Sequence, residues 1–110
     1  MPTISSVGKF DKKPEEVLPQ WIRYKDRLPQ GMALALAEVT AEDQLGNDIT
    51  NAVIQGTPEI IDEEQKIKFY VKGGSVGLRA DIKIVATMDD NVDPDLATTY
   101  VDYVVMLVKN

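Results

Sequence analysis

Short segments in which apolar and polar residues alternate strictly place the strongest constraint on the fold of this chain. Residues 66–72 (KIKFYVK) put Ile67, Phe69 and Val71 on one face and lysines with a tyrosine on the other. Successive side chains of a β-strand point to opposite faces, so this period of two predicts a strand with one buried face. The same period recurs in residues 17–28, 32–39 and 80–88, and residues 100–108 form a further run that is rich in valine, tyrosine and leucine.

Turn-forming residues separate these segments. Gly, Pro, Asn and Asp cluster at residues 29–31, 46–48, 56–58 and 73–77. Six or seven short strands with such spacing predict a single all-β sandwich or barrel. Pro19 cannot donate a ladder hydrogen bond, so its strand is expected at a sheet edge, or its regular part begins after this proline. The residues expected in the core are Ile22, Tyr24, Ile67, Phe69, Val71, Ile82, Ile84, Tyr103 and Val105.

The secondary structure of two further segments is less clear from the pattern alone. Residues 32–39 (MALALAEV) consist largely of helix formers, but leucine alternates strictly with alanine and the run is short between its flanking turns. We therefore expect a strand there. Residues 48–55 (DITNAVIQ) predict a short strand that ends at residues 56–58, and residues 60–61 predict the start of another.

The beginning of the chain lacks the pattern of a core element. Apolar residues are sparse in residues 1–13, and the run Asp-Lys-Lys-Pro at residues 11–14 breaks any periodicity. We expect an extended N-terminal arm over residues 1–13 and a sandwich domain over residues 14–110.

Composition limits the chemistry that 110 residues can perform. The chain contains no cysteine and no histidine, which excludes disulfides, thiol nucleophiles, zinc ribbons and Ser-His-Asp triads. We expect no catalytic activity, no cofactor and no structural metal. The net charge of −6 argues against a nucleic-acid or anionic-membrane partner, and no stretch approaches the ~20 apolar residues of a membrane span.

Two loop motifs are better explained by turns than by ligands. Residues 89–95 (DDNVDPD) begin like a calcium loop, but Pro94 occupies the position that needs glycine, and Tyr100 occupies the position of the bidentate glutamate. Residues 73–77 (GGSVG) lack the lysine and hydroxyl residues of a phosphate-binding loop, so we expect a turn that requires positive φ.

Charge is distributed unevenly along the chain. The first thirty residues hold six basic and four acidic side chains, whereas the remaining eighty carry a net charge of −8. A solvated strand face accounts for any one of these basic residues. The asymmetry as a whole is suited to head-to-tail docking between identical subunits.

Two stretches of sequence resemble a known family. Residues 13–18 (KPEEVL), followed by Ile22, Tyr24 and the pair Arg27-Leu28, resemble the opening of the small tail-fibre adaptor (fibre–tail adaptor) proteins of tailed bacteriophages. Tyr24 stands where this family usually has tryptophan. The glycine turn at residues 73–77, followed by a long alternating strand, is a second point of similarity.

The resemblance implies an immunoglobulin-like β-sandwich of about seven strands that serves as a non-enzymatic structural component of the virion. Its expected partners are copies of itself in a ring or symmetric array and other tail, neck or fibre proteins. The alternative is a carbohydrate- or partner-binding sandwich module of a larger surface assembly, with Trp21, Tyr70 and Tyr100 as stacking aromatics. For the virion protein, the residues expected at a partner interface are Ile4, Val7, Phe10, Lys12, Lys13 and Trp21.

Overall fold

A computed structural model describes residues 6–24, 32–90 and 98–110, which form seven strands and one helical turn. The four-residue helix is far shorter than a membrane crossing requires, and the described residues contain no other helix. In chain order, the elements are β1 (Ser6–Lys12), β2 (Leu18–Arg23), β3 (Met32–Glu42), α1 (Thr50–Val53), β4 (Ile54–Ile61), β5 (Lys66–Val71), β6 (Arg79–Asp90) and β7 (Thr98–Val108).

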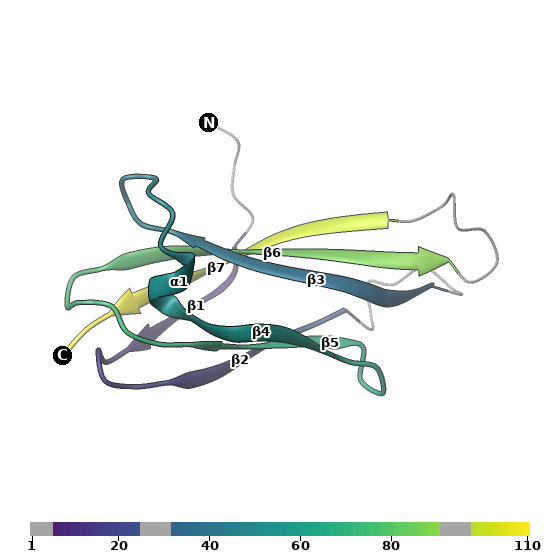
Figure 1. Cartoon of the computed structure of the whole chain (residues 1–110), viewed down its shortest axis with the longest axis horizontal. Helices are drawn as coiled ribbons and strands as arrows, with labels where there is room; N and C mark the ends of the chain where they lie inside the picture. Colours follow the sequence, from purple (N-terminus) through teal and green to yellow (C-terminus); the bar gives the residue numbers. More distant parts are fainter. Residues whose placement is uncertain (1–5, 25–31, 91–97) are drawn as a thin grey trace.

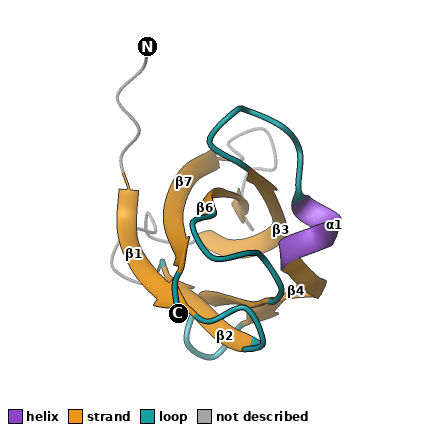
Figure 2. Cartoon of the chain, turned by 90° about the vertical axis from the view of Figure 1, so that its left-hand side faces the viewer, coloured by secondary structure: helices purple, strands orange, loops and turns teal. Residues whose placement is uncertain are grey.

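The strands form two sheets packed face to face, so the expected all-β sandwich is confirmed (Figure 1). One sheet has the order β1-β7-β6-β3 and the other has the order β2-β5-β4. The orders β3-β6-β7 and β2-β5-β4 are those of the C-F-G and B-E-D strands of an immunoglobulin-like sandwich. The first strand differs from the constant-type arrangement, because β1 pairs in parallel with β7 rather than with β2 (Figure 2).

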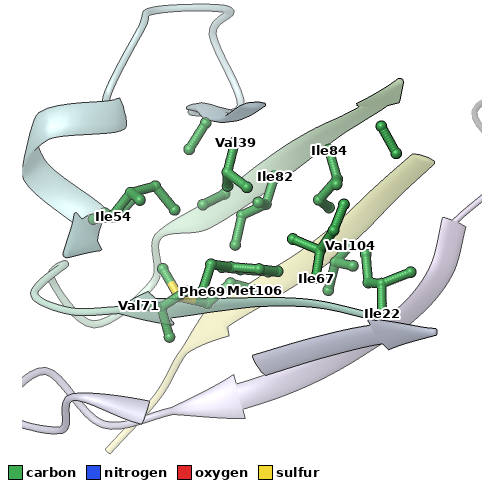
Figure 3. Close-up of a cluster of buried hydrophobic side chains, with 14 of the residues drawn as sticks. Ile22, Val39, Ile54, Ile67, Phe69, Val71, Ile82, Ile84, Val104 and Met106 are labelled. Atoms are coloured by element: carbon green, nitrogen blue, oxygen red, sulfur yellow. The ribbon is translucent and has the colours of Figure 1, made fainter. Parts of the chain in front are cut away.

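The core lies between the sheets, and strands of both sheets contribute to it, including Ile22 of β2, Val39 of β3 and Ile54 of β4 (Figure 3). Of the residues expected in the core, those in β2, β5 and β6 are buried, as is Tyr24 just after β2. β2 ends its sheet, which explains how the strand tolerates Pro19. The residues confirmed in the core are Ile22, Tyr24, Ile67, Phe69, Val71, Ile82 and Ile84.

The expectation for β7 selected the wrong face of the strand. The core receives Val104, Met106 and Val108 from β7, whereas Tyr103 is only partly buried on the opposite face. Val105 is buried, but it shares that outward face and lies outside the core cluster. Both parities of β7 are apolar, so periodicity alone could not choose between them.

Residues 32–39 form a strand, as expected, but a β-bulge interrupts its alternation. The register with β6 shifts between Leu34 and Leu36. Leu34 is therefore buried, while Leu36 is 62% exposed on the outward face. Beyond the bulge, Val39 and Ala41 return to the core. One extra residue in one strand of a pair is enough to reverse the faces that follow it.

Residues 48–61 differ from the expectation of two short strands. Residues 50–53 form the helical turn α1, and one continuous strand, β4, follows from Ile54. The turn signal at residues 56–58 lies inside β4, where the register with β5 shifts between Gln55 and Glu59. β4 is an edge strand, so it accommodates a glycine at φ 73° and a proline at this irregularity.

Residues 6–12 are part of the sandwich, which corrects the expected arm. They pair with β7 from Ser6 to Lys12, and Phe10 packs against the core. Backbone pairing with a central strand supplies the stability that the few apolar side chains of this segment could not supply alone. Residues 1–5 lie outside the described residues.

The glycine-rich segment at residues 73–77 is a turn that needs positive φ, as expected. Gly73 has φ 61°, and a Cβ atom placed on it would lie 2.8 Å from the carbonyl oxygen of Ala52. Left-handed backbone and close backbone approach both favour glycine at this position.

Candidate functional site

Strands β2 and β5 carry aromatic and basic side chains on the outward face of the three-stranded sheet, while β4 contributes Glu59 opposite Lys68. In the β2–β5 register, Trp21 lies opposite Lys68, and Arg23 lies opposite Lys66. Tyr70 is two residues beyond Lys68, so it shares the same face. We call the set Trp21, Arg23, Lys66, Lys68 and Tyr70 the Trp21 face.

Cations and rings are in direct contact within this face. The Nζ atoms of Lys66 and Lys68 each lie 5.7 Å from the centroid of the Trp21 ring, and Lys68 Nζ lies 5.2 Å from the Tyr70 centroid. These distances are in the range of cation–π attraction. Lys66 also forms a 2.7 Å ion pair with Glu64.

Both aromatic residues remain accessible to a partner. Trp21 is 49% exposed and Tyr70 is 38% exposed. Tryptophan, tyrosine and arginine are the residue types most often found at the energetic centre of protein interfaces. The face also offers ammonium and guanidinium groups to carboxylates, so it is suited to binding an acidic surface.

The structure divides the expected interface residues into two groups. Trp21 is exposed on the outward face of β2, and Lys13 is exposed in the turn after β1. Phe10 is partly buried and packs against the core. Lys12 is buried within the chain, which corrects its expected role at an interface. Ile4 and the side chain of Val7 lie outside the described residues.

Lys12 is a structural lysine. The residue is 1% exposed, and its ammonium group donates hydrogen bonds to the carbonyl oxygens of Lys13 (2.6 Å), Pro14 (3.2 Å) and Gly73 (2.6 Å). Burial lowers the pKa of Lys12 below its ordinary value, while Glu16 and Glu15 oppose that shift. The side chain fastens the end of β1 to the turn between β5 and β6.

Tyr100, expected as a stacking aromatic of a binding module, does not join the Trp21 face. Its ring stacks on Tyr24 with centroids 6.4 Å apart, and it packs against the core. The hydroxyl group of Tyr24 donates to Oδ2 of Asp102 at 3.2 Å, and Asp102 is itself only 6% exposed. This buried polar pair was not anticipated, because Asp102 interrupts an otherwise apolar strand.

The remaining carboxylates hold local structure or lie at the surface. Asp43 accepts hydrogen bonds from the amides of Leu45 and Asn47, and Asp48 accepts two from Thr50. Among the described residues, no three acidic side chains are close enough to hold a metal ion. The calcium-like loop lies largely outside the described residues, since residues 91–97 are among those not described.

The contact of Trp21 with two lysines was not predicted from the sequence. Lys66 and Lys68 belong to the alternating run that identified β5, but their contact with Trp21 depends on the β2–β5 register. The sequence features that could have indicated this contact are a tryptophan in one expected strand and alternating lysines in another. No local pattern indicates that the two strands pair.

No protein-family model, curated protein or solved structure matches this chain. Function is therefore inferred from the Trp21 face and the fold.

Proposed function

We propose that this protein is a non-enzymatic structural adaptor of a tailed-bacteriophage virion, which joins tail or neck and fibre components through repeated protein–protein interfaces. The observation that carries this proposal is the Trp21 face, a cationic and aromatic surface on a chain with a net charge of −6. The resemblance of residues 13–28 and 73–88 to fibre–tail adaptors supplies the virion context. The partners we propose are further copies of the chain in a ring or symmetric array and other tail, neck or fibre proteins.

Charge distribution supports a protein partner with an acidic surface. Arg23, Lys66 and Lys68 lie on one face, and each flanks or contacts the exposed indole. Complementary potentials orient a partner during encounter and disfavour partners of like charge. A half-exposed tryptophan at the centre of such a face gives the contact an apolar anchor.

A carbohydrate-binding module is the second candidate, because Trp21 and Tyr70 are exposed on the same sheet face. Stacking of a sugar requires an open ring face. The ammonium groups of Lys66 and Lys68 lie over the indole, and Lys68 also lies over the phenol ring. This arrangement favours an anionic protein surface over a neutral sugar.

Incorporation into particles tests the proposed function. Phage particles assembled with the wild-type chain should contain it in a fixed copy number, measured by quantitative mass spectrometry against the major capsid protein. Trp21→Ala and Lys68→Gln should each lower incorporation, with a tenfold loss corresponding to about 1.4 kcal/mol of interface energy. Lys83→Gln is the matched control, since Lys83 is an exposed lysine in the other sheet.

Two results would reject the proposal. The first is the absence of the wild-type chain from purified particles. The second is full incorporation of both Trp21 face variants. Saturable binding of neutral glycans by the monomer, abolished by Trp21→Ala, would favour the carbohydrate-binding module instead.

A further inference from the structure

A groove runs between the two edge strands on one side of the sandwich. It lies between residues 8–10 of β1 and residues 20–22 of β2, and its volume is about 140 Å³. Phe69 and Val104, two residues of the hydrophobic core, also line it. A cavity of roughly this size accommodates a ring such as benzene, so the groove has room for one apolar side chain.

The sheet topology explains why this groove exists. β1 pairs with β7, so it ends the four-stranded sheet, while β2 ends the three-stranded sheet. In the described part of the chain, no strand pairs with the outer edge of β2. Edge strands are the usual place where an extended segment of another protein adds to a sheet.

Gly8 lines the β1 side of the groove and has no side chain to occupy it. Its register partner is Val104, so a side chain at position 8 would share the inward face with that valine. A Cβ atom placed on Gly8 meets no other atom within 4 Å. A Cβ atom is therefore accommodated at this position, and a larger side chain would occupy part of the groove.

The rim of the groove is basic, and it is continuous with the Trp21 face. Lys9 lines the β1 side, and Trp21 lines the β2 side with Lys66 and Lys68 beside its ring. An extended segment directs successive side chains to opposite sides. Apolar side chains would then enter the groove, while acidic side chains would meet these lysines.

From these observations, we infer that the β1–β2 groove binds an extended segment of a partner protein in which apolar residues alternate with aspartate or glutamate. This inference rests on the proposed adaptor function and specifies the partner's binding segment. Residues 59–64 (EIIDEE) of this chain combine isoleucine with acidic residues, but the two types do not alternate, and the strand β4 is already paired with β5. A separate protein is therefore the occupant that the charge pattern favours.

Fluorescence of Trp21, the chain's one tryptophan, provides a direct readout. The probe is a synthetic octapeptide of alternating aspartate and leucine, compared with a peptide of the same composition whose aspartates are grouped together. We expect a saturable change for the alternating peptide, weaker at high salt because exposed charges are screened. Gly8→Val and Lys9→Glu should each weaken binding about tenfold or more, which corresponds to about 1.4 kcal/mol, with no change in thermal unfolding. The matched control is Lys83→Gln, which should leave binding unchanged.

Several outcomes would overturn the inference. One is equal binding of the two peptides. Another is wild-type affinity in Lys9→Glu, or in a folded Gly8→Val. A concentration-dependent dimer that Gly8→Val abolishes would assign the groove to a second copy. If Gly8→Val enters particles normally while Trp21→Ala does not, the groove inference fails and the adaptor function stands.

Discussion

Lys12 joins the end of β1 to the rest of the molecule through its buried ammonium group. Its three carbonyl partners come from the turn after β1 and from Gly73. Lysine is rarely fully buried unless its charge is satisfied, and here backbone oxygens satisfy it.

Replacing this lysine tests its structural role. Lys12→Met keeps most of the side-chain volume but leaves buried carbonyls without their donor, so we expect a loss of about 2 kcal/mol in unfolding free energy. Urea denaturation would measure the loss. Lys13→Met, at an exposed neighbour, should change stability by less than about 0.5 kcal/mol. Equal stability of the two variants would contradict the assigned role of Lys12.

Asp43 provides a pH-dependent contribution at the loop after β3. Hydrogen bonds from the backbone amide of Asn47 foremost, then from its side chain and from the amide of Leu45, hold the pKa of Asp43 below its ordinary value. A lowered folded-state pKa means that the contribution is complete above the unfolded pKa, which is about 3.9. It is lost as pH falls through the folded value.

The lowered pKa of Asp43 predicts how the stability of an Asp43 variant changes with pH. The difference in stability between wild type and Asp43→Asn should be larger at neutral pH than at about pH 3. Urea unfolding at both pH values would measure it. Glu63→Gln, in the exposed hairpin between β4 and β5, controls for the loss of one surface carboxylate. A difference that does not vary with pH would refute the assignment.

At the scale of elements, the bulge in β3 decides which leucine belongs to the core. Leu34 and Leu36 have the same parity in the sequence, yet one is 5% exposed and the other is 62% exposed. Ala35 is the extra residue between them, since their register partners Met88 and Thr87 are adjacent in β6, and this bulge accounts for the difference.

The two leucines form a matched pair for mutation. Leu34→Ala should cost about 2–5 kcal/mol, because it leaves a cavity between the sheets. Leu36→Ala should change stability by less than about 0.5 kcal/mol, since its side chain is largely solvated. Thermal or chemical denaturation of both proteins would show whether the bulge is present in solution. Similar costs at the two positions would place both side chains on one face.

At the scale of the whole molecule, the parallel pairing of β1 with β7 connects the N-terminal residues to the fold. It also separates β1 from β2, so one side of the sandwich has two strand edges beside the Trp21 face. The same pairing therefore affects both stability and the surface that we propose for partners.

Truncation measures the first of these effects. Deletion of residues 2–12 removes β1, Phe10 and Lys12 from the sandwich, so we expect a loss of several kcal/mol and a lower unfolding temperature. Circular dichroism during heating would measure the change. A truncated chain that unfolds at the wild-type temperature would show that β1 is dispensable for folding.

Local sequence was sufficient for much of the fold. Alternation in residues 66–72 and 80–88, together with the turn glycines, predicted β5, β6 and the β5–β6 turn, because side-chain period and allowed φ depend on neighbouring residues only. The tertiary structure decided the inward face of β7, the bulge in β3, the pairing of β1 with β7, and the contact of Trp21 with Lys66 and Lys68. Each of these depends on which strands pair and in what register. That choice is made by packing between residues far apart in the chain, where a shift of one position exchanges the two faces of a strand.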